Sequence, residues 1–278
     1  MGIDEEITRG ERLAIGKTKA VWEIVGDPYH VLIESFDDMT KGDGTDRITI
    51  ANKGALSNRT TCNCMQTLND AMIPTHYIEK CSATTFFALW ARMFPLEVIA
   101  RRLAYGSYLK RNPGVEEGRR FKDIVIEYHF KCDALHDPYV LYNRETEWYD
   151  MYKPKEPISP ETYLGEVPRD AFMPTYDELM YITSLQIRAF EILEAKWKTK
   201  NVELIDMKCE FGKTKRGEIV FADVIDDDSW RIEHEGVEKS KEVFRQMETV
   251  GDEEMLLLTQ NLEWVAEMTD SFPHDAAA

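Results

Sequence analysis

Hydrophobic and polar positions alternate in two short runs near the N-terminus, AVWEIV (20–25) and HVLIESF (30–36). Gly26-Asp27-Pro28 separates the two runs and is a strong turn signal, so the pattern predicts a pair of strands. Between Gly54 and Ala71 the apolar residues change to helical spacing, and Pro74 follows shortly after. The chain is therefore predicted to begin with β structure followed by one helix.

The middle of the chain is predicted to contain more strands. TTFFALWARMF (84–94) and PLEVIARRLA (95–104) indicate two strands around a turn, and DIVIEYHF (123–130) indicates a third. The segment from Pro154 to Pro174 is polar and rich in proline, which is typical of a surface loop.

Two helices are predicted in the last part of the chain. Thr175 and Glu178 have the spacing of a capping box, and apolar residues recur near helical period after them. A second helical pattern runs from Glu253 to Met268. The sequence thus predicts an α+β protein with a smaller β-rich lobe (1–85) and a larger lobe (86–278). A cleft between two lobes is a common place for a nucleotide.

Composition narrows the classes of function. The 278 residues include 43% hydrophobic and 31% charged residues, and the net charge is −17. A strongly acidic chain is a poor candidate for nucleic-acid binding, and any anion site must be a local basic pocket. No apolar run is long enough to span a bilayer, and the charged N-terminus lacks the apolar stretch of a signal peptide. With five irregularly spaced cysteines, the chain is predicted to be a reduced, cytoplasmic protein.

The segment LIDMKCEFG (204–212) carries the strongest chemical signal. Alternate residues of a strand share a face, so one face would be apolar and the other would carry Asp206, Lys208 and Glu210. Three charges on one face of a central strand are costly unless they bind something. The alternative is a solvated outer face of an antiparallel sheet.

A second acidic segment follows, EIVFADVIDDDSWRI (218–232), which is interpreted as the next strand of a hairpin. If the turn centres near Arg216-Gly217, Asp223 lies opposite Glu210. Two such carboxylates would suit a site for Mg²⁺ and phosphate, because Mg²⁺ usually takes one or two carboxylates plus substrate phosphates. The run from Asp226 to Asp228 is interpreted as a solvated turn.

Two glycine-containing segments could bind phosphate. In PLEVIARRLAYGSYLKRNPG (95–114), Glu97 and Arg101 share a strand face and a Gly-Ser turn follows, so the segment could hold a phosphate monoester. In IGKTKAVWEI (15–24), the GKTK turn could cover nucleotide phosphates, although it is not a Walker A loop. Ordinary exposed basic residues and a solvent-exposed turn are the respective alternatives.

Taken together, these segments resemble SAICAR synthetases along nearly the whole chain. The resemblance rests on the order and spacing of GKTK, PLEVIARR…GS…KRNPG, KCDALHDP, LIDMKCEFG and ADVIDDDSWR. The second half is most similar to the animal enzyme, whereas KGDGTDR and CDALHDP are more similar to bacterial forms. The animal enzyme carries a fused carboxylase domain, so a chain that ends after the synthetase portion is expected to be monofunctional.

The resemblance implies a two-lobed, ATP-grasp-like fold with antiparallel sheets and flanking helices. It implies that ATP and Mg²⁺ are the cofactors. It also implies that carboxyaminoimidazole ribotide (CAIR) is phosphorylated on its carboxylate, after which L-aspartate attacks the acyl phosphate to give SAICAR. The partners would be these small molecules, and the oligomeric state stays open.

The resemblance also implies roles for residues that match the family's motifs. The nucleotide and Mg²⁺ would be held by Gly16, Lys17, Lys19, Glu210 and Asp223, the last two being the metal ligands. Substrates would be bound by Asp43, Arg101, Ser107, Asp133, Asp137 and Arg231. Lys131, Asp206 and Lys208 would lie beside the reacting groups.

The sequence departs from the family pattern at a few positions. Tyr105 stands where the family usually has Thr or Ala before the Gly-Ser turn, and could narrow the ribotide site or point away from it. Ser240 stands where Asp is frequent, although Lys241 and Arg245 remain. A small-molecule kinase and a binding protein without catalysis are the competing hypotheses. The retained ribotide segment argues against the first, and the retained Lys17, Glu210 and Asp223 argue against the second.

Overall fold

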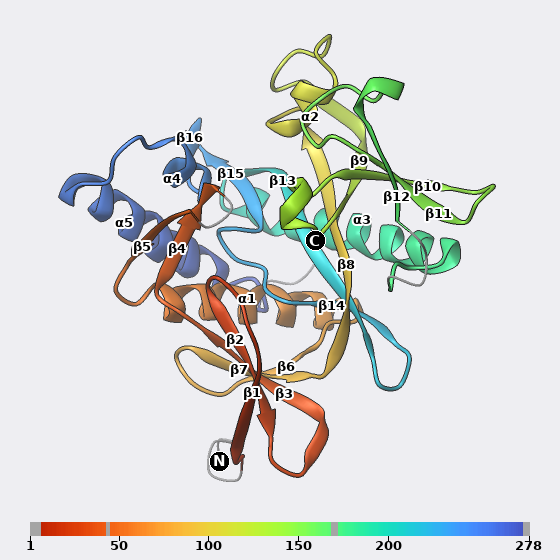
Figure 1. Ribbon diagram of the computed structural model, residues 1–278. Helices are drawn as coiled ribbons and strands as arrows, with labels where there is room; N and C mark the ends of the chain where they lie inside the picture. The colour runs from red at the N-terminus through yellow and green to blue at the C-terminus, as the bar shows by residue number, and fades with distance from the viewer. Residues whose placement is uncertain (1–6, 43–44, 168–171, 275–278) are drawn as a thin grey trace.

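The computed structural model describes residues 7–42, 45–167 and 172–274. Helices and antiparallel sheets are both prominent in these residues, which confirms the predicted α+β class (Figure 1). None of the described helices is long and apolar enough to cross a membrane.

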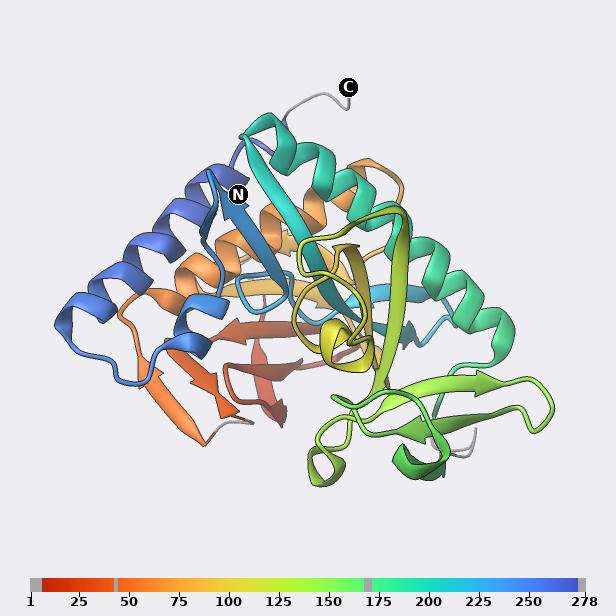
Figure 2. The same ribbon diagram turned by 90° about the horizontal axis from the view of Figure 1, so that it is seen from above.

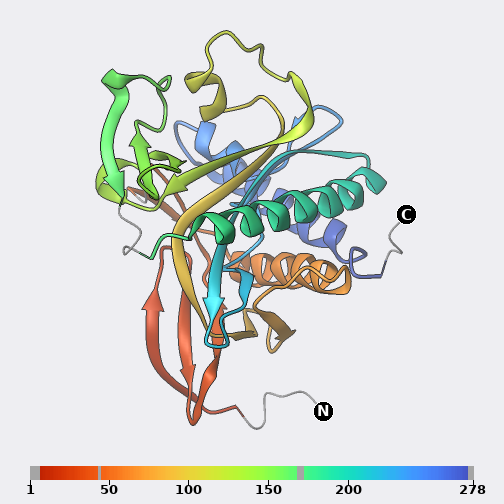
Figure 3. The same cartoon turned by 90° about the vertical axis from the view of Figure 1, so that its right-hand side faces the viewer.

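A small antiparallel sheet is built mainly from the first part of the chain. Within the described residues its strands are, in spatial order, β1 (Arg9–Ile15), β2 (Lys19–Ile24), β3 (Asp27–Ser35), β7 (Thr85–Leu89) and β6 (Tyr77–Lys80). The predicted pair, β2 and β3, is confirmed, and its turn uses Gly26 at a φ of +82°. Figure 3 shows β1, β2 and β3 extending away from the rest of the molecule.

The large sheet supplies the floor of the candidate site. Its strands among the described residues run in the order β12 (Tyr163–Val167), β11 (Trp148–Tyr152), β10 (Tyr139–Asn143), β9 (Arg120–Phe130), β8 (Ala91–Leu103), β13 (Val202–Thr214), β15 (Trp230–His234) and β16 (Val237–Glu238), and β14 (Ile219–Ala222) pairs with the far end of β13. The segment predicted as one strand after Glu218 is therefore two strands, β14 and β15, separated by a loop.

Strand β8 does not break where the sequence predicted a turn. It runs from Ala91 through Pro95 to Leu103, so residues 91–94 belong to it and not to the preceding strand. The pairing of β8 with β13 is irregular just beside Pro95, and the Pro95 carbonyl accepts a hydrogen bond from the Lys131 amide at 3.0 Å. Because proline lacks an N–H, a bulge is where a strand can accommodate it.

Two polar segments contain strands, one of them within the predicted loop from Pro154 to Pro174. Tyr163–Val167 forms β12 and pairs with β11, and residues 168–171 lie outside the described residues. The polar stretch after Asp37 forms a hairpin of β4 (Asp38–Lys41) and β5 (Asp46–Thr49). All three strands have only four or five residues, too few for their alternation to stand out from polar neighbours.

The predicted long helices are present with small shifts of their ends. They are α1 (Lys53–Asp70), α3 (Tyr176–Thr199) and α5 (Asp252–Thr269), and the short helices are α2 (Ser107–Arg111) and α4 (Glu242–Gln246). The capping box is confirmed, because the Glu178 amide donates to the Thr175 hydroxyl at 3.3 Å and the Thr175 amide donates to the Glu178 carboxylate at 2.9 Å. Figure 2 shows the three long helices gathered on one side of the large sheet.

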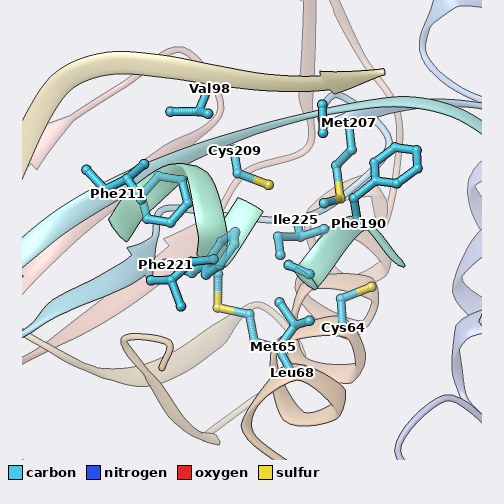
Figure 4. Close-up of a cluster of buried hydrophobic side chains, with 14 of the residues drawn as sticks. Cys64, Met65, Leu68, Val98, Phe190, Met207, Cys209, Phe211, Phe221 and Ile225 are labelled. Atoms are coloured by element: carbon cyan, nitrogen blue, oxygen red, sulfur yellow. The ribbon is translucent and has the colours of Figure 1, made fainter. Parts of the chain in front are cut away.

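The apolar face of β13 forms the centre of the core. Met207, Cys209 and Phe211 are buried against side chains of α1, α3 and the β14 region, including Met65 and Phe190 (Figure 4). This face is the one that the alternation predicted. Because the core occupies one side of β13, its charged residues are directed to the opposite, open side of the sheet.

Candidate active site

A pocket of about 1160 Å³ lies over the open face of β13. Its walls come from the turn between β1 and β2, the β4–β5 hairpin, the loop between β14 and β15, and α4. The sequence-predicted site residues that lie in the described ranges all line it, and they are Gly16, Lys17, Lys19, Arg101, Ser107, Lys131, Asp133, Asp137, Asp206, Lys208, Glu210, Asp223 and Arg231. Asp43 lies outside the described residues.

The floor of the pocket is the charged face of β13. Asp206 and Glu210 are 5% and 7% exposed, so the alternative of a solvated outer face does not hold for them. The neighbouring strand β8 places Arg101 opposite Asp206 and Glu97 opposite Glu210 in a regular antiparallel register. Arg101 and Asp206 are thus an oppositely charged pair across the two strands, whereas Glu97 and Glu210 are two carboxylates side by side, and each of them accepts a hydrogen bond from a lysine, Lys208 and Lys131 respectively.

One end of the pocket combines carboxylates and lysines. Lys131 Nζ donates to both carboxylate oxygens of Glu210 at 2.7 and 2.8 Å, and Lys19 donates to Asp223. Burial and the negative charge of Asp223 raise the pKa of Glu210, so the nearby lysines do not fully offset the cost of holding this carboxylate in its charged form. Burial also acts on Asp223, but the cations nearby, Lys19 first, outweigh it and lower the pKa of Asp223.

Asp223 reaches the pocket in a way the hairpin register did not predict. Ala222 and not Asp223 pairs with Glu210, so the expected pairing is wrong by one residue. The chain leaves the ladder at Asp223, whose φ is +68°, and its carbonyl is 2.9 Å from His76 Nε2. Burial lowers the pKa of His76 to about 4, so the neutral ring donates its Nε2–H to this carbonyl. The left-handed backbone turns the Asp223 side chain toward Lys19.

The opposite end of the pocket is rich in guanidinium groups. Arg101 and Arg231 both donate to the same oxygen of Asp206, the latter at 2.6 Å, and Arg101 Nη2 lies 3.3 Å from the Ser107 hydroxyl. Gly106, before Ser107, has a φ of +61°, and a β-carbon there would lie 2.7 Å from Arg231 Nη2. The Gly-Ser turn therefore needs glycine both for its backbone and for the space that Arg231 fills.

Lys208 lies between the two ends. Its ammonium donates to Glu97 Oε1 at 2.8 Å. Burial alone lowers the pKa of Lys208, but the negative charges of Glu97, Asp228 and Glu210 outweigh it and raise this pKa. Lys208 is therefore a cation at neutral pH, and its character is that of an electrostatic stabiliser and not of a base.

The acidic run after β14 is not the solvated turn that was predicted. Asp226 and Asp227 are 5% and 7% exposed, and burial raises the pKa of Asp227 well above its usual value. Asp228 accepts hydrogen bonds from Lys241 at 2.6 Å and from Arg245 at 2.8 Å. Asp226 and Asp228 line the pocket, and the Lys241 amide at the start of α4 donates to the Asp227 carbonyl at 3.2 Å, a contact with a distant part of the sequence that local polarity could not indicate.

Several lining residues were missed by sequence reasoning, namely Thr40, Lys41, Asp46 and Lys155. Thr40 and Lys155 come from short segments without a motif or a clear period, whereas Lys41 and Asp46 lie in KGDGTDR, a segment in which only Asp43 was assigned a role.

The two departures at Tyr105 and Ser240 have simple structural outcomes. Tyr105 does not line the pocket, and its hydroxyl is 3.8 Å from where a β-carbon at Gly118 would lie, so the ring points toward that loop. The Ser240 hydroxyl accepts a hydrogen bond from the Glu242 amide at 3.2 Å. The Ser240 side chain thus forms a serine turn just before α4, and Lys241 keeps its contact with Asp228.

A sequence model of the SAICAR synthetase family matches residues 12–255, which include the lining of the pocket. The chain belongs to the SAICAR synthetase family. It is 38% identical to a phosphoribosylaminoimidazole-succinocarboxamide synthase of Roseiflexus sp. (strain RS-1), with 95% of this chain and 98% of that protein covered. It is 36% identical to the human bifunctional phosphoribosylaminoimidazole carboxylase/phosphoribosylaminoimidazole succinocarboxamide synthetase, of which it covers 60%.

Solved structures of SAICAR synthetases share the fold. A structure described as a type-2 SAICAR synthetase in complex with ADP has a TM-score of 0.75 at 26% identity, covering 95% of this chain and 98% of that chain. The type-1 structure of SAICAR synthetase from Pyrococcus horikoshii OT3 has a TM-score of 0.70 at 27% identity, covering 88% and 97%. These comparisons confirm the predicted family and the predicted fold class.

Proposed function

We propose that this chain is a phosphoribosylaminoimidazole-succinocarboxamide synthase of purine biosynthesis. It joins L-aspartate to CAIR and converts ATP to ADP and phosphate, giving SAICAR. The observation that carries this proposal is a single pocket with a lysine–carboxylate end at Glu210 and Asp223, a guanidinium end at Arg101 and Arg231, and Lys208 between them. The ends suit a nucleotide and a phosphate monoester, and the centre suits the reacting carboxylate.

The nucleotide phosphates would lie under the turn between β1 and β2. The Gly16 amide donates to the Lys19 carbonyl at 2.8 Å, which closes a tight turn that carries Lys17 and Lys19. Lys19 is half-buried, and its carboxylate neighbours, Asp223 first, outweigh the effect of burial and raise its pKa, so it is a cation in the pocket. Cations in this position neutralise charge that develops on transferring phosphoryl groups.

Glu210 and Asp223 have the donor chemistry that Mg²⁺ requires. Among the described residues, no group of three or more His, Cys, Asp or Glu side chains could hold a metal ion unaided. Two carboxylates fit the ion nevertheless, since Mg²⁺ takes its remaining oxygens from substrate phosphates and water. When bound, the ion supplies charge neutralisation at the phosphates, and Glu210 and Asp223 would hold it.

The guanidinium end would hold the ribotide. Arg101 and Arg231 converge on Asp206, and Ser107 adds a hydroxyl beside Arg101. Guanidinium forks match phosphate oxygens in geometry and charge, so these groups suit a phosphate monoester. Asp206 fixes the two guanidinium groups relative to each other.

The reaction would proceed in two steps at the centre of the pocket. An oxygen of the ribotide carboxylate attacks the γ-phosphorus of ATP and ADP leaves, which forms an acyl phosphate. The amine nitrogen of aspartate then attacks the acyl carbon, phosphate leaves, and the nitrogen loses one proton. The Lys208 cation would stabilise negative charge in both steps, and alignment by the two ends of the pocket supplies the remainder.

Asp133 and Asp137 would contribute to the aspartate site together with Lys131. Both carboxylates line the pocket, and they follow β9 and Lys131 in the 3₁₀ turn Asp133–Leu135 and the residues after it. They could attract the substrate's ammonium, while Lys131 attracts a carboxylate. The role of Asp43 stays a prediction.

The setting of the enzyme is part of the same proposal. We place it in the cytoplasm, acting on small molecules, with a β-rich lobe at 1–85 that covers the nucleotide and a larger lobe at 86–278. No disulfide joins the described cysteines, which is compatible with a reducing compartment.

The test is ADP release by the purified protein with ATP and Mg²⁺, while CAIR and aspartate are omitted in turn. Release that needs both substrates and yields SAICAR supports the ligase. Glu210→Gln should abolish it, and Glu263→Gln, on the exposed face of α5, is the matched control that should not. ADP release that continues over many turnovers without aspartate would instead indicate a kinase. No ADP release under any combination of substrates would refute catalysis.

A further inference from the structure

Glu127 is a buried carboxylate that lies beneath the guanidinium end of the pocket without lining it. It is 3% exposed and comes from the middle of β9. One of its oxygens accepts from Arg101 Nε and the other accepts from Arg111 Nη2. A carboxylate that uses both oxygens on two different arginines fixes those arginines relative to each other.

The contact with Arg101 completes the restraint of that side chain. Arg101 donates through Nε to Glu127 and through Nη1 to Asp206, and its Nη2 faces Ser107 at 3.3 Å. The two carboxylates hold adjacent edges of the planar guanidinium, so the group cannot rotate without breaking one of them. The edge toward Ser107 is therefore presented in one orientation.

The contact with Arg111 extends the restraint to α2. Arg111 is the last residue of α2 and also donates to the Pro154 carbonyl, and its guanidinium lies 4.9 Å from the centre of the Tyr139 ring. Since α2 begins at Ser107, holding its last residue also fixes its first. Glu127 thus restrains Arg101 directly and Ser107 through the helix.

We propose that Glu127 is a positioning residue for binding of the ribotide phosphate, acting through Arg101 and through the Arg111–α2 segment. This inference rests on the proposed function, because it assigns the phosphate monoester to the guanidinium end. Glu127 does not touch substrate, and it determines how precisely the groups that do touch it are held.

Charge makes the inference testable by the sign of the effect. Around this end, Arg101, Arg111 and Arg231 face the three carboxylates Glu127, Asp206 and Glu242. Glu127→Gln makes the cluster more positive by one unit. If charge alone governed binding, this variant would bind a phosphate monoester more tightly, whereas loss of positioning makes binding weaker.

The experiment is steady-state kinetics of Glu127→Asp and Glu127→Gln, with each of the three substrates varied in turn. For both variants we expect the KM for the ribotide to rise about tenfold, with kcat and the KM for ATP changed less than about twofold. The inhibition constant of ribose 5-phosphate, which carries the phosphate and sugar without the reacting carboxylate, should rise in parallel. Arg111→Lys should reproduce the pattern and serves as the measurement if the Glu127 variants do not fold.

The matched control is Glu194→Gln. Glu194 accepts from Arg102 at 2.7 and 2.8 Å, a similar ion pair from a neighbouring residue that lies outside the pocket lining. Its kinetics should equal those of the wild type. An unchanged or lowered KM for the ribotide in the Glu127 variants would overturn the inference while the wild type remained an active ligase. A general defect, in which kcat falls and the KM values for all three substrates rise together, would overturn it as well. An inactive wild type would instead refute the proposed function.

Discussion

Replacing Gly106 by alanine tests whether the guanidinium end of the pocket binds the ribotide. The residue has a φ of +61° and a ψ of −128°, and the new methyl group would lie 2.7 Å from Arg231 Nη2. Two effects are therefore expected. The backbone is strained for any residue with a β-carbon, and the Arg231 guanidinium must move away from the turn.

The two effects have different magnitudes and different readouts. Backbone strain of this kind costs roughly 1–3 kcal/mol and lowers stability without touching a substrate. A charge-assisted hydrogen bond is worth about 1.5–3 kcal/mol. Since about 1.4 kcal/mol corresponds to a factor of ten, loss of the Arg231 contact should raise the KM for CAIR roughly 10- to 100-fold.

The assay is the KM for CAIR together with the thermal midpoint, and Gly217→Ala is the control. Gly217 has a φ of +87°, and no atom lies within 4 Å of where its β-carbon would be, so this variant has the strain without the displacement. Gly217→Ala should lower the melting temperature and leave the KM unchanged. If Gly106→Ala did the same, Arg231 would not contact the ribotide and the assignment of this end would be wrong.

Three further predictions concern the buried charges. Lys208→Met removes the central cation and leaves Glu97 without that partner, so kcat should fall about a hundredfold or more in single-turnover assays. The pKa of Glu210 is raised by burial, so the folded protein binds this proton more tightly and loses stability as the pH rises above the ordinary glutamate pKa. Glu210→Gln should therefore be inactive yet melt higher than the ligand-free wild type at pH 8, with the two converging in acid. The pKa of His76 is lowered from 6.5 to about 4, so the unfolded chain binds this proton first and the free energy of unfolding falls as the pH drops through this interval. His76→Gln keeps a donor for the Asp223 carbonyl, and it should reduce the pH dependence of the urea unfolding midpoint in the same interval.

Local alternation was enough to predict the floor of the pocket. In a strand the side chains change face at every residue, so Asp206, Lys208 and Glu210 had to share one face once LIDMKCEFG was assigned as a strand. The apolar residues between them, such as Met207, identified the core face, and the structure confirms this assignment. The placement needed no knowledge of the remainder of the chain.

Positions that depend on the backbone leaving a regular element could not be predicted in the same way. Asp223 was expected opposite Glu210, but the register of the hairpin places Ala222 there, and Asp223 itself leaves the ladder in a left-handed conformation just after β14. Asp226 and Asp227 were expected in solvent because their run is acidic. They are buried because α1 and α4, from distant parts of the chain, close over the loop. In the structure, the Thr61 hydroxyl of α1 lies 3.3 Å from the Ile225 carbonyl.

The short strands were missed for a related reason. A strand of four or five residues, such as β4 or β12, offers too few alternations to be distinguished from a polar loop. Its pairing is decided by a neighbour that the local sequence does not contain. Pro95 caused the opposite error, since a turn was predicted where β8 continues. A proline inside a long strand resembles a break until the bulge that accommodates it is known.

The regular stretch of β13 from Asp206 to Glu210 sets a fixed distance that matters for ligand design. Every residue in this stretch pairs with β8 without a shift, so at roughly 3.3 Å per residue the two ends of the floor are about 13 Å apart. Because β13 is paired with β8 along this stretch and with β15 and β14 at its two ends, its length cannot change to fit a longer or shorter ligand. A compound that ties a sugar phosphate to a nucleotide should therefore gain from both ends when its linker matches this length, and linkers of other lengths should reveal the spacing as a sharp optimum in affinity.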